Sequence, residues 1–303
     1  MRKKKKHFIE YDYEKAYAKQ LDNMHEWFVE QMIKRGKRTQ HALKEISSGE
    51  QLEIEIYPQF RTMDEVPEEG RIKKDNSQAQ KNLNDKNARK YVERLINNNF
   101  DNDDLWITLT YDEEHLPPDG DIDTAIKNVQ NYIKAINRKR KKLGLPNAKY
   151  IYITEYSPYA KIRWHHHIIM DGMMDRDIVE KMWKKGSRNN AKRLEKDENG
   201  FSGLANYIVK EKDRLKSEKR WNSSKGLIKP GTKVVHSKKD EKGIYRKIER
   251  YVKAMVQDRN EIEKQCKRWY PNYTFTSAEV YYNEFNCMFY IHARMRKEKK
   301  EGD

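Results

Sequence analysis

The order of apolar patterns between Leu105 and Met182 constrains the fold of this 303-residue chain more than any other feature. A strand-like run is followed by a long amphipathic helix, in which apolar residues recur every three or four positions. Two strand-like runs and a second helix come next. This order is typical of an α+β domain of split βαβ type, an antiparallel sheet with helices on one face. The expected elements are strands 105–111, 150–155 and 164–170, a helix over 122–143, and a helix that begins at the N-cap candidate Asp175.

The rest of the chain gives weaker patterns. Helical spacing of apolar residues predicts a helix, and strict alternation predicts a strand. These patterns predict helices over 14–46, 77–98, 203–218 and 244–268, and strands over 51–57 and 280–295. Residues 186–200 are polar and residues 221–243 are irregular in pattern, so we expect loops there.

Composition indicates the kind of partner. The formal net charge is +16 and the pI is about 9.4, which favours a polyanionic partner, because each neutralised phosphate releases condensed counterions. A membrane surface is the weaker alternative. The two cysteines are too few for a disulfide framework. With no secretion signal and no apolar run long enough to span a membrane, we expect a cytoplasmic protein.

Three consecutive histidines lie in the strand predicted over 164–170. Because side chains alternate across a strand, His165 and His167 share one face, and Trp164 and His166 share the other with apolar neighbours. The apolar set should pack under helices. His165 and His167 then lie side by side on an open face, where they could chelate one cation. A single strand histidine is usually structural, but this pair leaves both a metal-binding and a structural role open.

A metal site of this kind normally needs an anionic ligand as well. Glu155 ends the neighbouring strand, and the short connection 156–163 could bring it beside His165. Its parity is awkward, because Ile151 and Ile153 would share its face unless a bulge or twist re-aims it. Asp171 has the parity of the two histidines but falls at the end of the strand. Both carboxylates stay candidates.

Tyr207 and Lys210 lie three residues apart, so they are surface neighbours if this segment is helical. They could belong to an ordinary amphipathic face, or Tyr207 could be a nucleophile. A phenol with pKa near 10 is ionised to about one part in a thousand at pH 7, a penalty of roughly 4 kcal/mol. Lys210 and a metal ion could reduce that penalty. Attack on DNA would exchange one phosphodiester for another and would be reversible.

Three segments in this order resemble the motifs of the HUH endonucleases. They are Leu-Trp-Ile-Thr-Leu-Thr-Tyr at 105–111, Trp-His-His-His-Ile-Ile-Met at 164–170, and Asn-Tyr-Ile-Val-Lys at 206–210. Ser-Lys-Gly-Leu-Ile-Lys-Pro at 224–230 is similar to a further family element. The resemblance is to rolling-circle replication initiators of Gram-positive phages, plasmids and integrative elements, which are related to the filamentous-phage replication proteins.

The resemblance implies a role for each matched residue. Tyr207 would be the nucleophile and Lys210 its basic companion. His165 and His167 would bind a divalent metal, Mg²⁺ or Mn²⁺, with Glu155 as the leading carboxylate. The residues expected to contact DNA are Thr108, Thr110, Arg163, Ser224 and Lys225.

The resemblance also implies the reaction and its partners. It implies nicking and joining of a single-stranded or hairpin origin through a 5′-phosphotyrosine, with host helicase and polymerase as further partners. Two residues depart from the family pattern. His166 stands where a bulky hydrophobe is usual, which keeps a metal register that uses His166 open. Glu211 stands four residues after Tyr207, where a second tyrosine can occur, so we expect a single-tyrosine mechanism.

We therefore expect an endonuclease domain with an RRM-like or ferredoxin-like core over residues 77–235. A basic, partly helical N-terminal extension would cover 1–76, and a C-terminal helix and strands over 236–303 would pack on the domain or extend it. The hypothesis is a rolling-circle replication initiator. The alternatives are a relaxase or transposase with the same chemistry, or a basic nucleic-acid-binding protein without catalysis.

Overall fold

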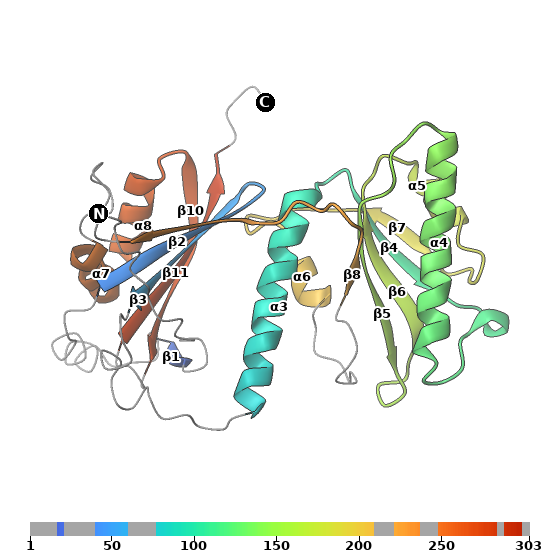
Figure 1. The fold of residues 1–303 in the computed structure, drawn as a ribbon, viewed down its shortest axis with the longest axis horizontal. Coiled ribbons are helices and arrows are strands. Elements are labelled where there is room, and N and C mark those ends of the chain that lie inside the picture. The colour runs from blue at the N-terminus through green and yellow to red at the C-terminus, as the bar shows by residue number, and fades with distance from the viewer. Residues whose placement is uncertain are drawn as a thin grey trace, which may run out of the picture. The chain divides into compact units, whose positions relative to one another are not determined.

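The computed structural model divides the chain into two compact units (Figure 1). Residues 87–229 form one unit, and residues 1–86 with 230–303 form the other. The residues that the structure describes are 17–20, 40–59, 77–208, 221–236, 248–283 and 288–298. Each unit has its own sheet and its own apolar core, and each is described here by itself.

The unit formed by residues 87–229 contains all three motifs and is built on a five-stranded sheet. Its strand order is β7-β4-β6-β5-β8, and every neighbouring pair is antiparallel. The strands are β4 (Leu105–Thr110), β5 (Tyr150–Ser157), β6 (Ile162–Met170), β7 (Asn190–Arg193) and β8 (Asn222–Ser223). Since β6 lies antiparallel between β4 and β5, those two strands run parallel. This is the split βαβ arrangement, and the α+β class is confirmed.

Two strands of this sheet were expected to be loops. β7 pairs with β4, and β8 pairs with β5 at the opposite edge. β7 has the sequence Asn-Ala-Lys-Arg and buries only Ala191. A strand that buries one small residue gives no alternation of apolar and polar side chains, so pattern analysis misses it.

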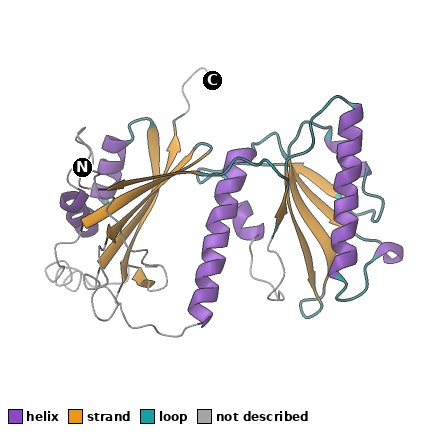
Figure 2. Ribbon diagram, in the orientation of Figure 1, coloured by secondary structure: helices purple, strands orange, loops and turns teal. Residues whose placement is uncertain are grey.

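Helix α4 (Ile122–Lys142) connects β4 to β5 and covers one face of the sheet (Figure 2). Its side chains Val129, Ile133 and Ile136 pack in one core with Ile107 and Ile168. The side chain of Asp121 caps the helix by accepting a hydrogen bond from the Thr124 amide at 3.0 Å. The short helix α5 (Arg176–Lys181) packs on the same face and is capped by Asp175, as predicted.

We expected helices on one face only, but the structure has them on both. Helix α3 (Ser77–Asn99) and helix α6 (Ser202–Ile208) lie on the face opposite α4. Within residues 87–229, Val92 and Ile96 of α3 and Ala205 of α6 form a second core with sheet residues such as Ile153 and Ile169. This covering follows from β6 itself, because both faces of its C-terminal half are apolar and buried. The predicted helix over 203–218 is observed up to Ile208, and its remainder lies outside the described residues.

The second unit has a six-stranded antiparallel sheet with the order β1-β10-β11-β3-β2-β9. Helices α7 (Ile248–Gln257) and α8 (Asn260–Trp269) pack their apolar sides against it. The strands are β1 (Tyr17–Gln20), β2 (Gln40–Ser48), β3 (Gln51–Gln59), β9 (Gly231–His236), β10 (Tyr273–Asn283) and β11 (Met288–Lys297). β3 pairs with β11, so segments from both ends of the chain share this sheet.

The helix predicted over 14–46 is wrong at both ends that the structure describes. Residues 17–20 and 40–46 are strands, and residues 21–39 lie outside the described part of the chain. β2 is paired on both sides, with β3 and β9, so both of its faces are buried. Leu43 and Ile46 are therefore both buried although they project from opposite faces of β2, and their spacing of three imitated a helix.

The other predictions outside the split βαβ core agree better with the structure. The helix over 77–98 and the strands over 51–57 and 280–295 are confirmed. The helix over 244–268 is two helices, which are separated at Asp258 and Arg259. The irregular segment 221–243 includes the strands β8 and β9. Among the described residues, no helix is both long enough and apolar enough to span a membrane.

A buried ion pair stabilises the end of β6. Arg140, with 0% of its surface exposed, donates from Nη2 to Asp171 Oδ1 at 2.6 Å and from Nε to the carbonyl of Pro146 at 2.7 Å. The other Asp171 oxygen accepts from the Lys149 amide at 2.5 Å. This pairing joins α4 to the strands β5 and β6.

Arg140→Ala should lower the free energy of unfolding by about 3–5 kcal/mol, because it leaves the Asp171 carboxylate buried beside no cation. Urea denaturation of the variant measures the loss. Lys141→Ala removes the adjacent, exposed cation of α4 and should change stability by less than about 0.5 kcal/mol. Equal stability of the two variants would contradict the assigned role of the pair.

Candidate metal centre and tyrosine site

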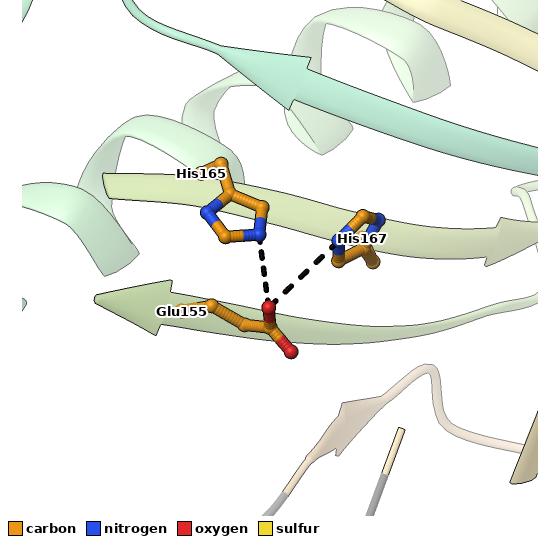
Figure 3. Close-up of side chains that lie close together, drawn as sticks. All are labelled: Glu155, His165 and His167. Carbon is orange, nitrogen blue, oxygen red and sulfur yellow. Dashed lines mark ion pairs between the residues drawn. The ribbon is translucent and has the colours of Figure 1, made fainter. Parts of the chain in front are cut away.

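Glu155, His165 and His167 come together on one face of the five-stranded sheet (Figure 3). The Nε2 atom of His165 lies 2.9 Å from Glu155 Oε2, and that of His167 lies 3.9 Å from the same oxygen. One ligand atom from each residue falls within 4.8 Å of the others. Glu155 is only 4% exposed. We call these three residues the His/Glu triad.

The pairing of β5 with β6 explains how the triad forms. Glu155 lies directly opposite His165, and Ile153 lies opposite His167. The carboxylate therefore shares the face of the two histidines, and the irregularity in this pairing comes only after Glu155. Ile151 and Ile153 do lie on this face, as their parity required, but they pack in the core with α3 and α6. The face is apolar and covered at one end, and the triad lies at the other.

Hydrogen bonds from neighbouring groups orient both imidazoles. His165 Nδ1 donates to the carbonyl of Arg163 at 2.9 Å, which leaves Nε2 directed toward Glu155. His167 Nδ1 lies 3.1 Å from Thr108 Oγ1, across the β4–β6 pairing. Partners on the far ring nitrogen are the usual way in which a protein fixes the tautomer of a ligating histidine.

The donor set fits a divalent metal ion. Two imidazole nitrogens and one carboxylate oxygen converge, and they are ligands of borderline softness that suit Mn²⁺ and later first-row ions better than Mg²⁺. The triad can bind a metal ion, but the donors alone do not select which one.

The other two candidate ligands are engaged elsewhere. Asp171 is held by Arg140 and by the Lys149 amide at the far end of β6. His166 is 0% exposed and projects from the opposite face of β6. There it is hydrogen-bonded to the Tyr111 hydroxyl at 2.8 Å and the Thr154 hydroxyl at 2.9 Å. Burial lowers the pKa of His166 to about 3, so the ring is neutral at physiological pH.

Helix α6 brings Tyr207 to the triad. Its hydroxyl lies 3.0 Å from His167 Nε2, and the residue is 41% exposed, so the oxygen is accessible to a large substrate. Burial, and secondarily the Glu155 carboxylate, raise the pKa of the Tyr207 phenol. In the metal-free arrangement the neutral phenol donates its proton to His167 Nε2.

Trp106 supports this arrangement, a role that we did not predict. Its ring stacks on His167 at 4.9 Å between centroids, with an angle of 10° between the planes. Tyr207 meets both rings edge-on, at 5.7 Å from Trp106 and 5.0 Å from His167. The sequence did contain a signal, because Trp106 shares the strand parity of Thr108, which pairs with His167.

The residues expected to contact DNA are dispersed over the unit. Thr108 contacts the triad through His167. Thr110 donates from its hydroxyl to the carbonyl of Arg188 at 2.8 Å, and Arg163 forms an exposed ion pair with Glu113 at 2.7 Å. Ser224 binds the backbone of Tyr150 on β5, and Lys225 is exposed. Lys210 lies outside the described residues.

The comparison with protein families agrees with this site. The family model of the replication-associated protein of the ORF2 and gene II protein type matches residues 104–212, about a third of the chain. The matched segment runs from the start of β4 past α6 and contains Trp106, the triad and Tyr207. Searches of curated proteins and of solved structures gave no match. The match supports a relationship to phage and plasmid replication initiators and a role in starting replication.

Removing any member of the triad should weaken metal binding. His165→Ala, His167→Ala and Glu155→Gln should each reduce Mn²⁺ affinity by at least about tenfold, because each removes one of three protein ligands. Titration calorimetry with MnCl₂ measures this. His115→Ala is the matched control, since His115 is exposed and lies outside the triad. Mn²⁺ binding that is unchanged in all three variants would exclude this metal centre.

His166→Ala should affect stability and spare the metal. The change opens a cavity and leaves the hydroxyls of Tyr111 and Thr154 without this partner, so we expect a loss of about 2–4 kcal/mol in unfolding free energy. Thermal and urea denaturation give the stability, and the calorimetric titration gives the Mn²⁺ affinity, which should stay within about twofold. A stable variant that has lost Mn²⁺ binding would show that His166 is the ligand instead.

Proposed function

We propose that this protein is an HUH-type DNA endonuclease and ligase that starts rolling-circle replication of a phage, plasmid or integrative element. It would nick origin DNA at one site through a covalent 5′-phosphotyrosine at Tyr207. One observation carries the proposal, namely the Tyr207 hydroxyl at 3.0 Å from His167, a member of the His/Glu triad. The match to replication-associated proteins favours replication over conjugative transfer or transposition.

The reaction is a transesterification. The Tyr207 oxygen attacks the scissile phosphorus, the bond from phosphorus to the DNA 3′ oxygen breaks, and the 3′ oxygen takes up a proton while the phenol proton leaves to water. One phosphodiester replaces another, so the step is nearly isoenergetic and the freed 3′ hydroxyl can reverse it. A divalent cation, Mg²⁺ or Mn²⁺, held by His165, His167 and Glu155 would polarise the phosphate and stabilise the developing charge.

The neighbouring side chains serve this chemistry by positioning. Trp106 and Thr108 fix the ring of His167, and α6 holds the phenol beside it. Because burial and Glu155 raise the pKa of Tyr207, the phenol needs positive charge nearby in order to react. Lys210, one turn after Tyr207, is proposed to supply part of that charge.

The substrate is proposed to be single-stranded or hairpin DNA. The net charge of +16 favours a polyanion, and a phosphate at the triad must be reached by a flexible, unpaired strand. Thr108, Thr110, Arg163, Ser224 and Lys225 are the proposed DNA contacts. A host polymerase would extend the freed 3′ hydroxyl behind a host helicase.

The nucleophile can be tested with DNA of unspecified sequence. The full-length protein is incubated with MnCl₂ and a labelled single-stranded oligonucleotide pool with a randomised centre, and denaturing electrophoresis reveals covalent adducts. Tyr207→Phe should reduce the adduct by at least about a hundredfold, because it removes only the attacking oxygen. Tyr91→Phe is the matched control, since Tyr91 is 39% exposed and Tyr207 is 41% exposed. A Tyr207→Phe protein that still forms the adduct would disprove the assignment.

A further inference from the structure

A groove opens beside His165, at the end of the sheet where β4 ends and β6 begins. Its volume is about 650 Å³, within the range of about 300–1,000 Å³ typical of ligand pockets. Residues 110–113 form one wall, residues 161–165 form another, and Ser187 and Arg188 form a third. The groove is therefore continuous with the triad through His165.

The walls of the groove suit a phosphate chain. Lys161, Arg163 and Arg188 bring three cations to it. Its two carboxylates are engaged within the walls, because Glu113 pairs with Arg163 and Asp112 accepts hydrogen bonds from Ser187. Lys161 and Arg188 are exposed, and neither forms an ion pair with another described residue. They can bind an anion without first breaking an ion pair.

The backbone at Lys161 is unusual. Lys161 has a φ of +53°, in the left-handed region, where glycine or asparagine is more common than lysine. The position is the last residue before β6 in the tight connection from β5. A lysine here places a cation at the entrance to β6, although a residue better suited to the turn would be easier to accommodate.

The groove and Tyr207 lie on opposite sides of the triad along the strands. Tyr207 contacts His167 and Trp106, whereas the groove reaches His165 and Thr110. In the β4–β6 pairing, Thr110 lies opposite His165 and Thr108 opposite His167. Moving from Trp106 toward the end of β4, the order is thus the phenol, then the triad, then the groove.

We infer that this groove binds the DNA nucleotide whose 3′ oxygen leaves during nicking, an inference that rests on the proposed function. In an in-line displacement the attacking and leaving oxygens lie on opposite sides of the phosphorus. Attack by Tyr207 from the side of His167 directs the 3′ oxygen toward His165 and the groove. The bond from phosphorus to that oxygen breaks, and the released strand keeps its 3′ hydroxyl.

The same groove then holds the strand needed for the reverse step. Lys161 and Arg188 would contact the phosphates on the 5′ side of the freed nucleotide, and this would keep its 3′ hydroxyl beside the phosphotyrosine for joining. The strand that remains covalently linked to Tyr207 leaves on the other side. Changes in the groove should therefore affect the 3′-hydroxyl strand far more than the linked strand.

The test uses the full-length protein with MnCl₂. Sequencing the products of the randomised pool defines a nicked sequence, and two oligonucleotides are then made, one for each side of the nick. The variant is Lys161→Gln with Arg188→Gln, which leaves the Arg163–Glu113 pair intact. The control is Lys127→Gln with Lys134→Gln, two exposed cations of α4 on the opposite face of the sheet.

Two measurements are made on each protein. The first is the concentration of the 3′-hydroxyl strand that gives half-maximal joining to the phosphotyrosine adduct. The second is the binding of each strand by fluorescence anisotropy, which needs no catalysis. We expect the groove variant to need about tenfold more 3′-hydroxyl strand and to bind it about tenfold more weakly, with the other strand unaffected. The control should resemble the unmodified protein.

Two results would overturn the inference alone. They are unchanged binding and joining in the groove variant, or an equal loss for both strands. Absence of any adduct from the unmodified protein would instead refute the proposed nicking chemistry, and the inference with it. Recovery of strand binding in Lys161→Arg with Arg188→Lys would show that positive charge is what the groove provides.

Discussion

The pairing of Glu155 with His165 across β5 and β6 is the constraint on which the rest of the site depends. A side chain changes faces with every residue along a strand, so a slip of one residue would turn the carboxylate away from both imidazoles. The register is maintained by the apolar residues farther along these strands, which are buried on both faces. The same packing that stabilises the sheet therefore also assembles the metal ligands.

Covering both faces of the sheet is what allows a second element to reach the triad. α4 packs on the face of His166, and α3 and α6 pack on the face of His165 and His167. Ala205 and Ile208 fix α6 to the sheet, and Tyr207 between them projects to His167. Trp106 completes the arrangement by stacking on His167. The phenol is thus positioned by an apolar core.

Much of this could be predicted from the sequence, because strand parity depends only on counting residues. It separated His165 and His167 from His166, and it identified Glu155 as a candidate. It could not choose between Glu155 and Asp171, since that choice depends on Arg140, which is distant in the chain and holds Asp171. β7 and β2 were missed for related reasons. One buries a single alanine, and the other is buried on both faces, so neither alternates.

The central claim is that the triad and Tyr207 form one reactive site. The most direct test is mass spectrometry of the tryptic peptides from the covalent DNA adduct. Residues 197–210 form one such peptide, and Tyr207 is its only tyrosine. The account predicts that the nucleotide is carried by this peptide, at Tyr207, and only when Mn²⁺ is present. A nucleotide on any other residue, or an equal yield in the presence of a chelator, would contradict it.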